Sequence, residues 1–199
     1  MSQFDAVARE WDMNKMHQDR TLAIAKEMAK VIPFNKEWSV LEFGAGTGLL
    51  SFHLKDRFKQ ITLVDNSSEM IKVCEEKCSL LKSSHIHPVC IDLEHNVLDK
   101  SFDLIYSQMA LHHVGDVVDV FKTFYELLNI GGYLSIVDLY SEDGSFHGPD
   151  AKVHLGFEPR ELQIQLEKVG FKEVAFYSCY DLKRENGQVY PLFLLTAIK

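Results

Sequence analysis

The segment VLEFGAGTG carries glycine at three alternate positions, Gly44, Gly46 and Gly48, where a ligand could lie against bare backbone. A short apolar run precedes these glycines and the helix-like run LLSFHLKDRF follows them, so we expect a tight turn between a strand and a helix. Leu49 stands where the dinucleotide-binding pattern GxGxxG has its third glycine. The phosphate-binding P-loop is also excluded, because no Gly-Lys-Ser or Gly-Lys-Thr occurs here. A turn that needs glycine for its backbone conformation alone is the alternative interpretation.

Three acidic residues lie at the ends of apolar runs around this turn. Glu42 stands two residues before Gly44, Asp65 ends the run ITLVD, and Asp92 follows IHPVC. Because ligands bind at the carboxyl edge of parallel sheets, we expect these carboxylates to face one site, where a carboxylate can accept both hydroxyls of a ribose. Three acids with no Lys or Arg in these segments suit a ligand with a ribose and a positive charge, and suit a pyrophosphate poorly. Each acid alone could be a helix cap or a surface charge.

The elements that must position these residues alternate along most of the chain. Apolar runs predict strands over 39–43, 61–65, 86–92, 102–107 and 133–139. An apolar stripe predicts an amphipathic helix over 19–32, stopped by Pro33. Further helices are expected after the glycine turn, from Ser67 or Ser68 to Lys82, and over 116–128, the last closed by Gly131 and Gly132. This alternation predicts a mainly parallel sheet covered on both faces.

The end of the chain departs from this alternation. A helix is expected over 159–170, with Pro159 in its first turn and Gly170 at its end. The stretches 171–182 and 188–199 follow with only a short polar loop between them, so they must pair as antiparallel strands, because a parallel crossover needs about a dozen residues or more. We therefore predict an α/β, doubly wound, mostly parallel seven-stranded sheet with an antiparallel strand near one edge. We expect one compact domain overall, with an N-terminal helical lid over 1–35 and the main domain over 36–199.

With these motifs the chain resembles the class I S-adenosylmethionine-dependent methyltransferases, in the broad small-molecule group (type 11 and type 12 methyltransferases) that carries the pattern VLExGxGTG. The resemblance extends from about Trp11 to Lys199. It implies a Rossmann-like methyltransferase fold and binding of S-adenosylmethionine by the domain over 36–199. It further implies transfer of a methyl group to a small-molecule acceptor by in-line displacement, with S-adenosylhomocysteine as the product.

The resemblance also implies a role for each part of the site. The methionine part of the cofactor would contact Glu42 and the backbone of Gly44, Ala45 and Gly46. The adenosine part would contact residues after the second and third strands: Asp65 on the ribose hydroxyls, Asn66 and Met70 beside it, and Asp92 and Leu93 on the adenine. The sulfonium end would lie near Ser107 and Gln108, and Trp11 would close over the cofactor.

The chain departs from the family at two places. The segment over 126–132 lacks the proline and lysine that relatives often carry, which affects a structural element only. No Asp-Pro-Pro, Asn-Pro-Pro or Ser-Pro-Pro motif follows the fourth predicted strand. Because that motif holds a planar nitrogen, the exocyclic amine of adenine and the side chain of protein glutamine are disfavoured acceptors.

No catalytic residue is assigned from the sequence. Alignment of the nucleophile can supply several kcal/mol by itself, and a general base is needed only if the acceptor must lose a proton. The candidate bases are His112, His113, His147, His154 and Glu142. One histidine of the pair 112–113 often packs structurally in such proteins.

Two segments are candidates for covering the site. The apolar residues Phe4, Val7, Trp11 and Met16 could form a lid, or could belong to ordinary helix packing. The polar, glycine-bearing segment over 140–157 has the length of a substrate-covering loop. A solvated connection is its alternative interpretation.

Composition limits the class of protein. Lys plus Arg total 21 against 29 for Asp plus Glu, a net charge of -8, which argues against a protein that coats nucleic acid. No run approaches the roughly 18–20 apolar residues of a membrane helix, and the start lacks the apolar region of a secretory signal. We expect a cytoplasmic protein that binds neither nucleic acid nor membrane. The sequence makes no prediction of oligomeric state.

The remaining expectations concern the state of the four cysteines and two alternative functions. Cys74, Cys78, Cys90 and Cys179 are too scattered for a disulfide framework and lack zinc-site spacing, so we expect reduced thiols and no metal site. A non-catalytic module that binds S-adenosylmethionine is one alternative function. A nicotinamide-dependent Rossmann oxidoreductase is the other, disfavoured by Leu49 and by the antiparallel end of the sheet.

Overall fold

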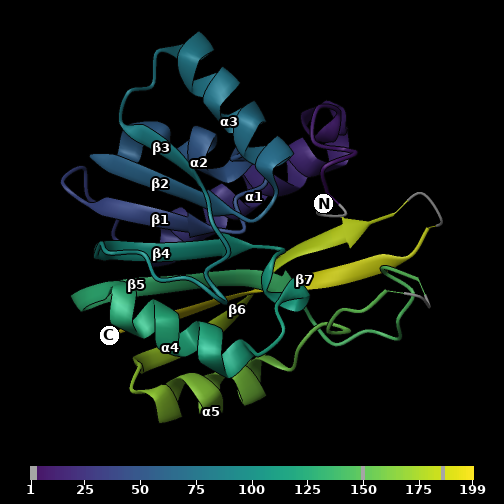
Figure 1. The fold of residues 1–199 in the computed structure, drawn as a ribbon. Helices are drawn as coiled ribbons and strands as arrows, with labels where there is room; N and C mark the ends of the chain where they lie inside the picture. The colour runs from purple at the N-terminus through teal and green to yellow at the C-terminus, as the bar shows by residue number, and fades with distance from the viewer. Residues whose placement is uncertain (1–3, 149–150, 185–186) are drawn as a thin grey trace.

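Runs rich in apolar residues form the seven strands of one sheet in the computed structural model, which describes residues 4–148, 151–184 and 187–199 (Figure 1). The strands are β1 (Ser39–Phe43), β2 (Gln60–Asp65), β3 (Ile86–Cys90), β4 (Phe102–Gln108), β5 (Leu128–Leu139), β6 (Lys172–Lys183) and β7 (Val189–Ile198). Their order is β3-β2-β1-β4-β5-β7-β6, and β7 runs antiparallel to both of its neighbours. The predicted fold class is confirmed.

Helices cover both faces of this sheet (Figure 1). Along the chain they are η1 (Trp11–Met13), α1 (Lys15–Val31), α2 (Leu49–Leu54), η2 (Lys55–Arg57), α3 (Ser68–Leu81), η3 (Leu111–His113), α4 (Val117–Leu127) and α5 (Pro159–Val169). Buried side chains of α1, α2 and α3 belong to one apolar cluster, and those of α4 and α5 belong to the other. No helix in the described part of the chain is long and apolar enough to cross a membrane.

Side-chain caps set several helix ends. The Asn14 side chain accepts a hydrogen bond from the Met16 backbone at 2.9 Å, so α1 begins four residues before the predicted start. Ser67 is the N-cap of α3, which settles the choice left open between two serines. The prediction that two glycines close α4 is wrong. The helix ends at Leu127, and Gly131 and Gly132 lie inside β5, because the chain passes directly from helix to strand.

The pleat of the strands decides which side chains can reach a common site. Along β4, Leu104 and Tyr106 belong to the apolar cluster shared with α1 and α2, whereas Ile105 belongs to the cluster of α4 and α5. Side chains alternate between the two faces of a strand. Gln108 therefore shares the face of Tyr106, and Ser107 shares the opposite face with Ile105.

Candidate active site

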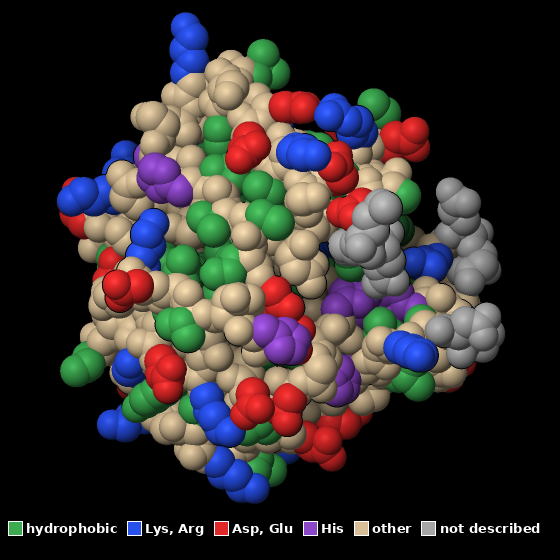
Figure 2. Space-filling view, viewed as in Figure 1, with side chains coloured by type: hydrophobic (Ala, Val, Ile, Leu, Met, Phe, Trp, Pro, Cys, Tyr) green, Lys and Arg blue, Asp and Glu red, His purple; other side chains and the backbone are tan. Residues whose placement is uncertain are grey.

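A cavity of about 380 Å³ lies at the carboxyl ends of β1, β2 and β4, with the N-terminal segment as one of its walls. This is the edge where doubly wound sheets bind ligands, and the volume is typical of small-molecule sites, which span roughly 300–1,000 Å³. On the face shown in Figure 2, histidine and acidic side chains lie next to each other near the middle.

The glycine turn brings the backbone close to neighbouring elements. Gly44 has φ +63°, and a Cβ there would lie 2.3 Å from the Cβ of Ala110. Gly46 has φ +54°, and a Cβ there would meet only the Met70 sulfur, at 4.0 Å. Because Gly46 lines the cavity, the missing side chain leaves room for a ligand.

Asp65 holds this turn in place from the end of β2. One carboxylate oxygen accepts a hydrogen bond from the Gly46 N–H at 2.8 Å, and the other accepts one from the Ser67 N–H at 2.8 Å. Burial raises the pKa of the Asp65 carboxyl, and the backbone donors oppose that rise. The carboxylate thus has a fixed orientation on the cavity wall.

Glu42 is the most deeply buried acid of the cavity, with 3% of its surface exposed. Its Oε2 atom accepts hydrogen bonds from the N–H of Ser51, at 3.2 Å, and from the Ser51 hydroxyl, which lies 2.6 Å from the hydroxyl oxygen of Tyr106. Burial raises the pKa of Glu42 to about 8. A cationic ligand beside Glu42 would favour the ionised form.

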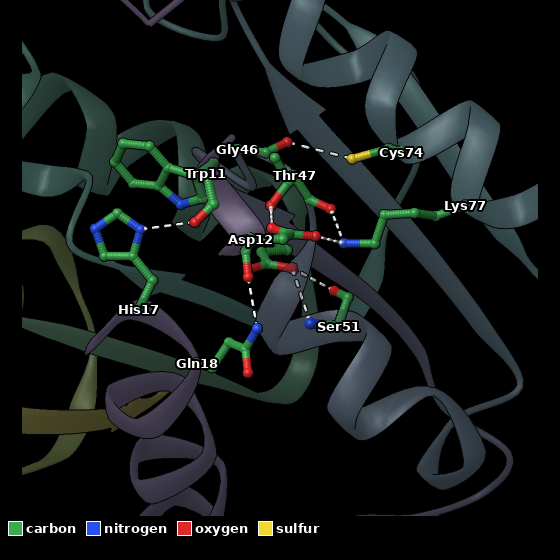
Figure 3. A network of polar contacts seen from close by, with 10 residues as sticks. Trp11, Asp12, His17, Gln18, Gly46, Thr47, Ser51, Cys74 and Lys77 are labelled. Atoms are coloured by element: carbon green, nitrogen blue, oxygen red, sulfur yellow. Dashed lines mark hydrogen bonds and ion pairs between the residues drawn. The ribbon is translucent and has the colours of Figure 1, made fainter. Parts of the chain in front are cut away.

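The N-terminal segment is tied to the glycine turn by a polar network (Figure 3). The Lys77 ammonium lies 2.7 Å from the Asp12 carboxylate and donates to the Thr47 carbonyl oxygen at 2.7 Å. The Thr47 hydroxyl donates to Asp12 at 2.5 Å. Sequence reasoning assigned no role to these three residues, because no local pattern shows which side chains pair across the fold.

Trp11 lines the cavity and has aromatic neighbours there. The ring of Trp11 lies 4.1 Å from the ring of His17, between centroids, and Phe4 contacts both Trp11 and His113 edge-on. Phe4, Trp11 and Met16 line the cavity. Val7 does not, and 43% of its surface is exposed.

The structure brings nearly all of the predicted cofactor-binding residues to this cavity. The lining includes Trp11, Glu42, Gly44, Ala45, Gly46, Asp65, Asn66, Met70, Asp92, Leu93 and Gln108. The Asp92 carboxylate also accepts from the Glu94 N–H at 2.9 Å and contacts His95 at 2.8 Å. Ser107 is the exception. Its buried hydroxyl has no hydrogen-bond partner in the described part of the chain and stays outside the lining, because the pleat directs it to the other face of β4.

The candidate bases divide into two groups. His112, His113 and His147 line the cavity, whereas His154 and Glu142 lie outside it. The Nε2 atom of His154 lies 3.1 Å from the Val114 carbonyl oxygen. The candidate substrate-covering segment over 140–157 is described by the structure except for positions 149–150, which lie outside the described residues.

His112 has a fixed ring orientation. Its Nδ1 atom lies 2.6 Å from Oδ1 of the buried Asp138, and its backbone N–H donates to Oδ2 at 3.2 Å. Burial lowers the pKa of His113 to about 3 and also lowers the pKa of His147. The ring nitrogens of the three histidines lie within 4.8 Å of one another, so by ligand type they could hold a metal ion.

Two arginines on the same cavity wall were missed by sequence reasoning. Arg20 of α1 is only 5% exposed, and Arg184, the residue after β6, lies over the Phe146 ring at 4.4 Å. Their positive charges oppose a metal cation at the neighbouring histidines. The sequence contained a signal for Arg20. This charged residue lies four positions before Ile24 and thus on the apolar face that Ile24 and Met28 form.

Comparison with known proteins assigns a family to this fold and cavity. Residues 41–136 match the family model described as a methyltransferase domain. An uncharacterized methyltransferase of Schizosaccharomyces pombe is 33% identical over 76% of this chain and 60% of its own length. A malonyl-[acyl-carrier protein] O-methyltransferase of a Marinomonas species is 31% identical over 66% of this chain and 48% of its own length. The chain thus spans about half the length of these curated relatives.

A solved structure shares the whole fold. It is the methyltransferase in the complex with the Haloferax volcanii Trm112 methyltransferase activator, with a TM-score of 0.83 over 100% of this chain and 98% of that one. The two sequences are 18% identical, so this likeness shows the fold alone.

Proposed function

Because this chain belongs to the class I S-adenosylmethionine-dependent methyltransferases, we propose that it transfers a methyl group from S-adenosylmethionine to a small-molecule acceptor by in-line displacement. The observation that carries the proposal is the carboxylate of Asp65, fixed beside Gly46 on the cavity wall next to the buried Glu42. When bound, the cofactor supplies a methyl carbon that its sulfonium activates.

Glu42 and Asp65 lie at one end of the cavity, here called the acidic end, and the residues there fit this cofactor. Glu42 and the Gly44–Gly46 backbone would hold the methionine part, and the space left at Gly46 admits a ligand against the main chain. Asp65 would accept the ribose hydroxyls. The adenosine would contact Asn66, Met70, Asp92 and Leu93, and the sulfonium end would lie near Gln108.

The N-terminal segment would close this site as a lid. The network from Asp12 to Lys77 and Thr47 holds Trp11 at the cavity, so the segment can exclude water from the reacting atoms. The cavity volume of about 380 Å³ supports a small acceptor. The main contribution of the protein would then be alignment of the acceptor with the methyl carbon.

Calorimetric titration identifies the cofactor. The protein is titrated with S-adenosylmethionine and S-adenosylhomocysteine, and in parallel with NAD and NADP as the alternative cofactors. We expect micromolar binding of the first pair only, and binding of a nicotinamide dinucleotide instead would overturn the proposal. Asp65→Ala should lose this binding, whereas Asp119→Ala, at a carboxylate 69% exposed on α4, is the matched control and should retain it.

Methyl transfer itself is tested by incubating the protein with isotopically labelled S-adenosylmethionine and a panel of acceptors of different chemistry. Transfer of label to an acceptor supports the enzyme. A protein that binds the cofactor but transfers label to no acceptor would instead be the non-catalytic binding module.

A further inference from the structure

Arg20 is a buried cation on the wall of the cavity. Its side chain lies on the face of α1 that packs against the sheet, with 5% of the residue exposed. The Nε atom has no hydrogen-bond partner among the residues that the structure describes. Burial lowers the pKa of Arg20 to about 10, so the guanidinium remains charged at neutral pH. A buried charge of this kind calls for an anionic partner.

The acid that acts most strongly on Arg20 is already engaged. Asp138 acts on Arg20 electrostatically, but its Oδ1 atom is bound by the His112 ring at 2.6 Å and by the Leu139 N–H at 2.7 Å. Its Oδ2 atom accepts from the His112 N–H at 3.2 Å. Asp138 therefore offsets part of the charge, while Nε of Arg20 has no hydrogen-bond partner among the described residues.

Arg20 and Glu42 lie among different charged groups. Asp138 of β5 and Tyr180 of β6 favour the charged form of Arg20, whereas Arg184, which follows β6, opposes it. Charges that act on Glu42 come from Lys77 and Asp65, on α3 and β2. Among the residues that line the cavity, Glu42 and Asp65 form an acidic end, and Arg20 and Arg184 form a basic end, where the histidines also line it.

Gln108 stands on the wall of the same cavity, beside α1. Its amide nitrogen donates to the Thr21 hydroxyl at 2.9 Å, which ties the end of β4 to the residue after Arg20. Its Oε1 atom is buried and has no partner within the described residues. An unpaired donor and an unpaired acceptor on the wall of one cavity indicate that a polar molecule completes both.

We propose that Arg20 and Arg184 bind an anionic group of the methyl acceptor, a carboxylate or a phosphate, at the basic end of the cavity. The inference rests on the proposed function and extends it to a substrate class. A guanidinium fork matches both groups, because it donates two parallel hydrogen bonds to two oxygens. The N–H or O–H of the same acceptor would donate to Oε1 of Gln108.

The test uses the protein saturated with S-adenosylhomocysteine. A protein without a functional cofactor site is then recognised before any anion is added, because it does not bind S-adenosylhomocysteine. Malonate and inorganic phosphate are titrated at constant ionic strength, with dimethyl malonate as the uncharged probe, and binding is followed by calorimetry. We expect saturable binding of at least one of the two anions and none of the ester. Which anion binds distinguishes a carboxylate from a phosphate.

Variants assign this binding to the basic end. Arg20→Gln should weaken anion binding by about tenfold or more, because it removes the positive charge and the charge-assisted hydrogen bonds of the guanidinium. Arg184→Gln should weaken it as well, and serves if the first variant does not fold. The matched control is Arg160→Gln, at an exposed arginine of α5 that donates to the Gln163 side chain at 2.9 Å, and it should leave anion binding unchanged.

Three results would overturn the proposal. The first is no saturable anion binding by a protein that still binds S-adenosylhomocysteine, and the second is unchanged anion binding in both arginine variants. The third is loss of affinity for S-adenosylmethionine in Arg20→Gln with unchanged affinity for its decarboxylated analogue. That last result would assign Arg20 to the carboxylate of the cofactor. Failure of S-adenosylhomocysteine to bind the unaltered protein refutes the proposed function instead.

Discussion

Replacing Glu42 by glutamine should stabilise the free protein and weaken its binding of S-adenosylmethionine. Glutamine keeps the shape of the side chain and an oxygen that accepts from Ser51, so the packing of α2 on β1 is retained. What changes is the cost of holding an acid in a buried site, where the pKa of Glu42 is raised from 4.5 to about 8.

The magnitude follows from proton linkage. Below pH 4.5 both the folded and the unfolded chain carry the proton on Glu42, and the acid costs nothing. As pH rises from there to about 8, only the unfolded chain releases the proton, so the free energy of unfolding falls by about 1.4 kcal/mol per pH unit. The gain from Glu42→Gln is therefore about 3 kcal/mol at pH 7, or about 6–12 °C in Tm. It should level off near pH 8.

The assay is thermal and urea unfolding of both proteins between pH 4.5 and 8.5 without cofactor. Glu37→Gln is the matched control, because that carboxylate is 78% exposed beside the start of β1, and it should show no such pH dependence. A stability difference between Glu42→Gln and the unaltered protein that stays constant with pH would refute the reasoning, as would a difference that shrinks as pH rises.

The same acid links cofactor binding to protons. A sulfonium or ammonium beside Glu42 favours its ionised form, so binding of S-adenosylmethionine at pH 7 should release a proton. Calorimetry in buffers of different ionisation enthalpy measures that release. It should be absent in Glu42→Gln, whose affinity for the cofactor should also be lower.

Three other substitutions test single features of the site. Trp11→Ala should weaken cofactor binding without changing the melting temperature much, and unchanged affinity in calorimetry would refute the lid. Asp65→Ala should lower the affinity by a few kcal/mol, since hydrogen bonds to charged groups contribute about 1.5–3 kcal/mol each; a small change would show that the ribose binds elsewhere. Gly44→Ala should lower the melting temperature, because its Cβ would lie 2.3 Å from that of Ala110, and Ala110→Gly should restore stability only in part, since φ stays at +63°.

The acidic end of the cavity was predictable because it depends on local pattern and one rule of topology. Glu42 and Asp65 end apolar runs, and parallel strands bring such ends to one edge. The antiparallel pairing of β6 with β7 was predictable as well, since the loop between them is too short for a crossover.

The basic end was not predicted, because it depends on which faces pack together. The sequence places Ser107 and Gln108 at one strand end, but the pleat observed in the structure is needed to show that only Gln108 lines the cavity. Arg20 is 164 positions from Arg184, and only the packing of α1 beside β6 brings both to one wall. Short-range patterns carry no information on such pairs.

The acidic end and the basic end of the cavity would bind reactants of opposite charge. Asp65 favours a cation and repels an anion, as does Glu42 once a bound cation has ionised it. Arg20 and Arg184 do the reverse, so each reactant is directed to one end. Charge interactions are stronger in a water-excluded site than in bulk solvent. A cationic methyl donor and an anionic acceptor would therefore bind in the single orientation that aligns the nucleophile with the methyl carbon, and that alignment is the main requirement of an in-line displacement.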